Sequence, residues 1–126
     1  MTDRGSALTA LVVENSSAAP AGWLGVWLPE AGLAVQTCRP HAGESPPGNP
    51  SAWGALVVLG GVVGAYDDGL APWLPRTRAL LAAAVAAGIP TLGVCLGAQL
   101  LAAAAGGGVA PGGAGPEVGL VPLRLT

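Results

Sequence analysis

Four short apolar runs, separated by glycine, proline and polar residues, set the pattern of this chain. Their apolar positions are continuous rather than alternating, which is typical of strands buried on both faces of a parallel sheet. They cover residues 7–13, 33–38, 55–59 and about 90–94. A fifth apolar run, 120–125, predicts a last strand.

A first helix is expected between the first two strands. Pro20 can occupy the first position of a helix, and Pro29 with Gly32 should end it. One helical face of this segment is apolar, and its residues are Trp23, Leu24, Trp27 and Leu28. We interpret the two tryptophans as core residues; a pair that stacks on a ligand is the alternative.

Two further helices are expected, one over about 76–87, closed by Gly88, and an alanine-rich one that follows Cys95 and runs to about Ala105. Strands that alternate with helices predict an α/β fold, a parallel sheet with flanking helices. Residues 1–126 are long enough for a single domain with a modest core.

The polar and glycine-rich loops of this α/β pattern follow the carboxyl ends of the expected strands. Parallel sheets bind their ligands beyond that edge. The loops are 14–17, 39–53, 60–69 and 95–96. The pattern therefore predicts one functional site at this edge.

Composition excludes several classes of function. The net charge of −2 gives no basic surface for nucleic acid or anionic lipid. The two cysteines, Cys38 and Cys95, lie far apart in the sequence and form neither a disulfide framework nor a metal site; Cys38 is interpreted as a packed thiol within its strand. We expect no metal, no cofactor and, with no signal peptide visible, a cytoplasmic protein.

A membrane hairpin is an alternative for the second half of the chain. No charged residue occurs between Arg78 and Glu117. Glycines and prolines interrupt every window of 20 residues there, however, and alanine is a weak membrane anchor. We therefore expect no membrane partner.

Cys95 is the strongest candidate for chemistry. Gly93 and Gly97 flank it two residues away on either side, between an expected strand and an expected helix. This is the spacing of a nucleophile elbow, with cysteine where hydrolases place serine. Its neighbours must be small because the turn is tight. The start of a helix also favours the thiolate over the thiol. A buried, inert thiol is the alternative.

Five segments together resemble the class I, triad-type glutamine amidotransferases, and most closely their GMP-synthase-like branch. The resemblance runs from Leu11 over the rest of the chain. The segments are Leu59-Gly60-Gly61, Gly64-Ala65-Tyr66-Asp67-Asp68, Pro72-Trp73-Leu74, the stretch from Leu92 to Leu101 and Gly115-Pro116-Glu117-Val118-Gly119.

The resemblance implies hydrolysis of L-glutamine, with the ammonia passed to a synthase. It implies that Cys95 attacks the side-chain amide and forms a thioester. The backbone N–H groups of Gly61 and Leu96 would form the oxyanion hole. Gln99, with Gly60 and Gly61, would contact glutamine; a solvated helix residue is the alternative for Gln99. Tyr66 and Asp67 match a loop near the site without an assigned role.

Three departures from the family pattern bear on activity. Val62-Val63 replaces a frequent Pro-Met pair, and Pro29 interrupts the first helix. The histidine and glutamate of the family's triad have no counterpart after Cys95, so we expect a C-terminally truncated, incomplete domain. His41, the one histidine, lies upstream and is interpreted as a solvated loop residue rather than a substitute base. Glu117 is interpreted as structural.

The residues leave three functions open. The chain is an amidotransferase domain weakened by its incomplete triad, a non-catalytic remnant that binds glutamine or a partner, or a cysteine-elbow protein of the DJ-1/PfpI kind. Gln99 and the Gly60-Gly61 loop favour the first two. The partner would be a synthase subunit or the missing C-terminal half.

Overall fold

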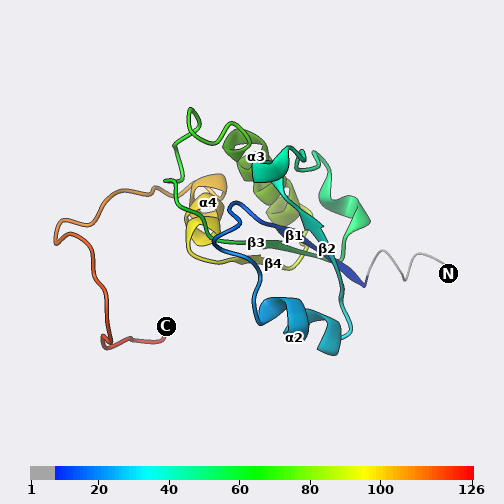
Figure 1. The fold of residues 1–126 in the computed structure, drawn as a ribbon, viewed down its shortest axis with the longest axis horizontal. Coiled ribbons are helices and arrows are strands. Elements are labelled where there is room, and N and C mark those ends of the chain that lie inside the picture. The colour runs from blue at the N-terminus through cyan, green and yellow to red at the C-terminus, as the bar shows by residue number, and fades with distance from the viewer. Residues whose placement is uncertain (1–7) are drawn as a thin grey trace.

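A four-stranded, fully parallel sheet forms the centre of the protein (Figure 1). The structure is a computed structural model that describes residues 8–126. The strands lie in the order β2-β1-β3-β4, and their bounds are β1 (Thr9–Val13), β2 (Ala34–Cys38), β3 (Ala55–Val58) and β4 (Thr91–Gly93). The four expected strands are thereby confirmed; the expected start of the first, at Ala7, lies outside the described residues.

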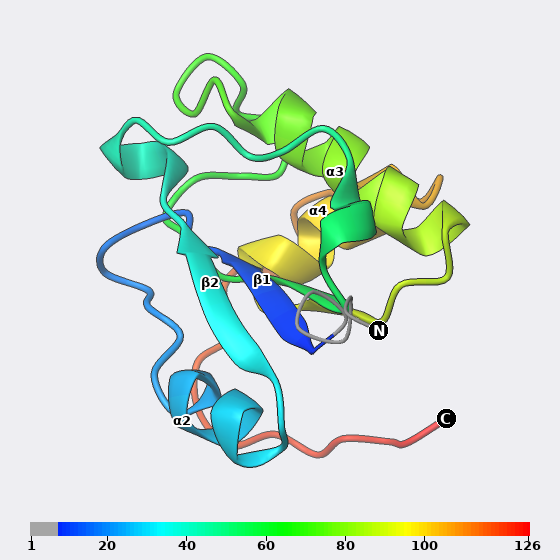
Figure 2. The ribbon, with the colours of Figure 1, turned by 90° about the vertical axis from the view of Figure 1, so that its right-hand side faces the viewer.

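Helices cover both faces of the sheet, as the α/β pattern predicts. Figures 1 and 2 show α2 on one face, with α3 and α4 on the other. Their bounds are α2 (Leu24–Glu30), α3 (Leu74–Ala86) and α4 (Leu96–Ala104). Two single-turn 3-10 helices, η1 (Pro40–Ala42) and η2 (Pro50–Ala52), shape the loop that follows β2.

The core divides into two clusters because successive residues of a strand point to opposite faces. Leu11 and Val13 of β1 pack with α3 and α4. Val12 of the same strand packs on the other face with Leu24 and Leu28 of α2. β1 and β3 lie at the middle of the sheet and are buried on both faces, as their continuous apolar sequences predict.

The interpretation of Trp23, which directly precedes α2, and of Trp27 within α2 as core residues is wrong. Trp23 and Trp27 are 69% and 55% exposed, and their rings stack on each other at a centroid distance of 6.0 Å. The helix is short and only its Leu24 and Leu28 side packs, partly buried, against the sheet, so the residues one position earlier fall outside the contact. Pro20 also precedes the helix rather than opening it.

The last expected strand, 120–125, does not form. Residues 105–126 contain no helix or strand, and Figure 1 shows this tail leaving the body after α4. Leu120, Leu123 and Leu125 are almost fully exposed. A strand needs a hydrogen-bonded partner, and this segment has none within residues 8–126. None of the helices described is long and apolar enough to cross a membrane.

Candidate active site

Cys95 occupies a strained turn between β4 and α4, as the elbow spacing predicts. Its backbone has φ 55° and ψ −114°, and it is the one non-glycine residue with positive φ among residues 8–126. Such a conformation is costly for a residue with a side chain and persists only where the surroundings impose it. The turn leaves Cys95 exposed at the first turn of α4.

The glycines around Cys95 are required by close packing of the backbone. A Cβ atom on Gly97 would lie 1.8 Å from the carbonyl oxygen of Val58, and one on Gly93 would lie 2.5 Å from the carbonyl oxygen of Gly97. Both neighbours are backbone atoms that cannot rotate away. The G-x-C-x-G spacing therefore lets α4 begin directly against β3, with β4 alongside.

The loop after β3 lies beside the elbow. A Cβ atom on Gly60 would lie 3.4 Å from Cβ of Cys95, and one on Gly61 would lie 2.7 Å from the side chain of Leu96. The N–H groups of Gly60, Gly61 and Leu96 donate to no other group within residues 8–126. Unpaired N–H donors next to an exposed thiol are what an oxyanion hole requires.

Gln99 lies one turn after Cys95 on α4 and lines a cleft of about 290 Å³. The other walls come from the loop after β3 and from the start of the tail, and the lining residues are Gly64, Ala65, Tyr66, Asp67, Val109, Ala110 and Pro111. Gln99 makes no hydrogen bond with another described side chain, so its amide is available to a ligand in this cleft.

Polar contacts within the loop 64–69, and between this loop and Arg78 of α3, hold it in place. Asp67 accepts from the N–H of Gly64 at 2.6 Å. Arg78 of α3 donates two hydrogen bonds to Asp68, at 2.9 and 2.8 Å, and its guanidinium lies 6.0 Å from the ring centroid of Tyr66. These contacts give Asp67 and Asp68 structural roles and hold in place the loop that lines the cleft together with Gln99.

His41 is not a solvated loop residue, which corrects the sequence-based interpretation. Its Nε2 lies 2.8 Å from Oε2 of Glu14, the same oxygen that Nε of Arg39 reaches at 3.1 Å. Glu14 is 6% exposed, so hydrogen bonds from these two side chains give a buried carboxylate its partners. Glu14 follows a buried strand at the carboxyl edge, a signal that could have marked it in the sequence.

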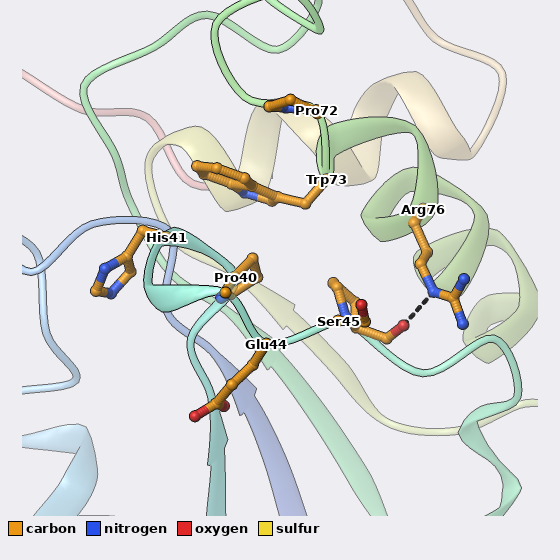
Figure 3. Close-up of a pocket in the computed structure, with 9 residues that line it drawn as sticks. Pro40, His41, Glu44, Ser45, Pro72, Trp73 and Arg76 are labelled. Atoms are coloured by element: carbon orange, nitrogen blue, oxygen red, sulfur yellow. Dashed lines mark hydrogen bonds between the residues drawn. The ribbon is translucent and has the colours of Figure 1, made fainter.

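The strand order keeps His41 away from Cys95. His41 follows β2 and Cys95 follows β4, with β1 and β3 between them. Three strand spacings amount to about 14 Å, well beyond the reach of a proton-transfer partner. His41 instead lines a cleft of about 510 Å³ together with Trp73 and Arg76 (Figure 3). Figure 3 shows His41 and Arg76 at opposite ends of it.

The remaining residues singled out in the sequence lie apart from Cys95. Cys38 is buried at the end of β2, as predicted, and burial raises the pKa of its thiol, with a smaller contribution from the charge of Glu44. Glu117 is exposed in the tail, so the expectation of a structural role is wrong. No cluster of metal-ligating side chains occurs in the part of the chain that the structure describes.

A comparison with family models gives the family. The model described as glutamine amidotransferase class-I matches residues 37–122, which include the loop after β3, the elbow and α4. The chain belongs to this family. The resemblance noted from the sequence motifs is thereby confirmed at the level of the family.

Individual relatives agree with this membership. A protein of Salmonella typhimurium named as glutamine amidotransferase-like, YfeJ, is 31% identical over 113 residues, covering 79% of this chain and 43% of its own. Among solved structures, a glutamine amidotransferase from Methylobacillus flagellatus has a TM-score of 0.73 and 32% identity, covering 79% of this chain and 39% of its own. Another, from Thermotoga maritima, has a TM-score of 0.71 and 26% identity, covering 79% and 43%. The chain thus spans about two fifths of the length of these relatives.

Proposed function

We propose that this chain supplies the nucleophile half of a glutamine amidotransferase site, with Cys95 as the attacking residue. The Cys95 thiolate bonds to the side-chain amide carbon of L-glutamine, and the C–N bond then breaks to release ammonia and leave a glutamyl thioester. Water attacks the thioester and releases glutamate. The observation that carries the proposal is the exposed Cys95 at φ 55°, next to three unpaired N–H groups.

The N–H groups of Gly61 and Leu96 are the proposed oxyanion hole. In the tetrahedral intermediate the amide oxygen carries negative charge, and donors already fixed in place stabilise that charge without reorganisation. Gln99 and Gly60 are the proposed contacts for glutamine. They border the elbow from two sides, since Gln99 lies on α4 and Gly60 lies in the loop after β3.

The proton transfers require a group that residues 8–126 do not bring to Cys95. A base must take the thiol proton, and an acid must protonate the departing ammonia. His41 is the one histidine of the sequence and is held by Glu14 beside β2, at the other end of the carboxyl edge from Cys95. We therefore propose an incomplete domain, whose acid–base partner comes from a further protein segment or subunit.

The activity test uses the purified chain. We expect glutamine to bind weakly and to slow alkylation of Cys95, with glutaminase turnover reduced by about 10²–10⁴ relative to a site with its acid–base group. Glutamate release is followed with a coupled dehydrogenase, with Cys95→Ala as the control. Robust turnover lost in Cys95→Ala but kept in His41→Ala would contradict the missing-base argument, because a base other than His41 would be acting. Turnover unaffected by Cys95→Ala would place the chemistry elsewhere.

A non-catalytic role is the second candidate, and the separation of His41 from Cys95 favours it. In that role the cleft lined by Gln99 binds glutamine, or an adjoining surface binds a synthase, without turnover. Glutamine protection of Cys95 that persists while a supplied partner subunit restores no glutamate release would support it. The GMP-synthase-like branch and a cytoplasmic location remain predictions from the sequence.

A further inference from the structure

Asn15 connects three parts of the protein that are far apart in the sequence. It lies two residues after β1, is 5% exposed, and uses both ends of its side-chain amide. Its Nδ2 donates to the carbonyl oxygen of Leu59 at 2.9 Å. Its Oδ1 accepts from the indole Nε1 of Trp73, next to α3, at 2.9 Å. A buried amide that is bonded at both ends is held in one orientation.

The bond to Leu59 fixes the peptide that precedes the glycine pair. The N–H of Leu59 donates to the carbonyl of Val13 at 3.0 Å, so this residue is bonded on both its N–H and its C=O. In a trans peptide the carbonyl and the following N–H point in opposite directions. The bond that turns the Leu59 carbonyl toward Asn15 therefore turns the N–H of Gly60 away from β1, toward the side of Cys95.

Asn15 also limits the position of Gly61. A Cβ atom on Gly61 would lie 2.7 Å from the side chain of Leu96 and 3.2 Å from Cβ of Asn15. The backbone of Gly61 therefore lies close against both side chains. Its N–H is one of the two donors of the proposed oxyanion hole.

We infer that Asn15 is a positioning residue for the oxyanion loop, acting through the carbonyl of Leu59, with Trp73 as its second anchor. The inference rests on the proposed function. Asn15 touches neither the substrate nor Cys95; its effect is on where the N–H groups of Gly60 and Gly61 lie.

Two electrophiles distinguish the contribution of the oxyanion loop from the intrinsic reactivity of the Cys95 thiol. A chloromethyl ketone shaped like glutamine alkylates Cys95 with release of chloride, and its carbonyl occupies the position of the substrate amide. Iodoacetamide alkylates the same sulfur without needing the oxyanion hole. The ratio of the two rate constants, measured on the full chain, therefore reports the hole and glutamine recognition together, whereas iodoacetamide alone reports the reactivity of the thiol.

Three variants remove the two hydrogen bonds of the Asn15 side chain, either together or one at a time. Asn15→Leu removes both hydrogen bonds, Asn15→Asp at pH 8 keeps an acceptor for Trp73 but has no donor for Leu59, and Trp73→Phe removes only the indole donor. We expect the ratio to fall about tenfold or more in both Asn15 variants, short of the 10²–10³ that follows loss of a whole oxyanion donor. Trp73→Phe should lower it about threefold or less. Leu80→Val, a buried change on α3, controls for lost stability and should leave the ratio unchanged.

The possible failures are distinguishable. If the wild-type protein shows no preference for the chloromethyl ketone and no protection by glutamine, the proposed function is wrong. If the wild-type protein shows both and folded Asn15→Leu keeps the ratio, the inference about Asn15 is wrong. If Asn15→Leu does not fold, Asn15→Asp decides in the same way. A fall in Trp73→Phe as large as in Asn15→Asp would overturn the route through Leu59.

Discussion

The elbow and the tail are both rich in glycine and leucine, yet they use these residues in opposite ways. At the elbow, a Cβ atom on Gly61, Gly93 or Gly97 would meet another atom at 2.7 Å or less. In the tail, a Cβ atom on Gly112 or Gly113 would meet nothing within 4 Å. The first glycines are required by the approach of α4 to the sheet, whereas packing does not require the second.

The leucines show the same contrast. Leu100 of α4 is fully buried, whereas Leu123 of the tail is 87% exposed. Both lie in runs that predicted regular structure. The difference is that α4 packs Leu100 against the sheet, while no strand or helix of residues 8–126 pairs with the tail. Apolar character therefore shows that a segment can be buried, and a neighbouring element decides whether it is.

Substituting one glycine in each region is the strongest test of this contrast. Gly97→Ala places a Cβ atom 1.8 Å from the Val58 carbonyl oxygen, so β3 and α4 must separate. We expect it to lower the free energy of unfolding by about 3 kcal/mol or more. Gly112→Ala, the matched change in the tail, should alter it by less than about 0.5 kcal/mol. Urea denaturation measures both, and equal stabilities for the two variants would refute the packing argument.

Local patterns were sufficient to predict most of the fold. The four strands were recognised because each is a continuous apolar run, and Cys95 was recognised because two glycines flank it between a strand and a helix. These features depend on neighbours within a few residues. The carboxyl-edge rule then correctly placed the loops after β1, β2, β3 and β4 on one side of the sheet.

Contacts between distant segments could not be predicted in this way. Asn15 bonds residues 44 and 58 positions away, and Glu14 pairs with His41 across 27 positions. The place of Glu14 directly after a buried strand marks it as a candidate, but nothing in the local sequence shows which distant groups Glu14 and Asn15 bond. The exposure of Trp23 was missed for a related reason, because helical periodicity groups residues on a face without showing how wide a contact the sheet provides.

The two cysteines test whether the elbow presents its thiol to solvent. Cys95 is exposed, whereas Cys38 is 7% exposed and burial raises the pKa of its thiol. Since the thiolate is the reactive form, iodoacetamide at pH 8 should modify Cys95 at least about tenfold faster than Cys38 in the folded protein. Peptide mass spectrometry over a time course gives both rates. The difference should vanish in urea, and faster modification of Cys38 without denaturant would mean that the turn is wrongly placed.

The loop 64–69 lies between the two extremes, since it is partly exposed and is tied to α3 by the pair of Asp68 and Arg78. The hydrogen bonds from Arg78, and then its charge, hold the pKa of Asp68 below its usual value. A carboxyl whose pKa is lowered by folding stabilises the protein above its unfolded pKa of about 4 and loses that contribution as the pH falls through the folded value.

Asp68→Asn should therefore be slightly less stable than the wild-type protein at pH 7, with a difference that shrinks below about pH 4. Because the pair is partly exposed, 1 M NaCl should also reduce the difference at pH 7. Urea denaturation at pH 7 and pH 3 measures it, and a difference unchanged by pH and salt would mean that the loop is held by packing rather than by this ion pair.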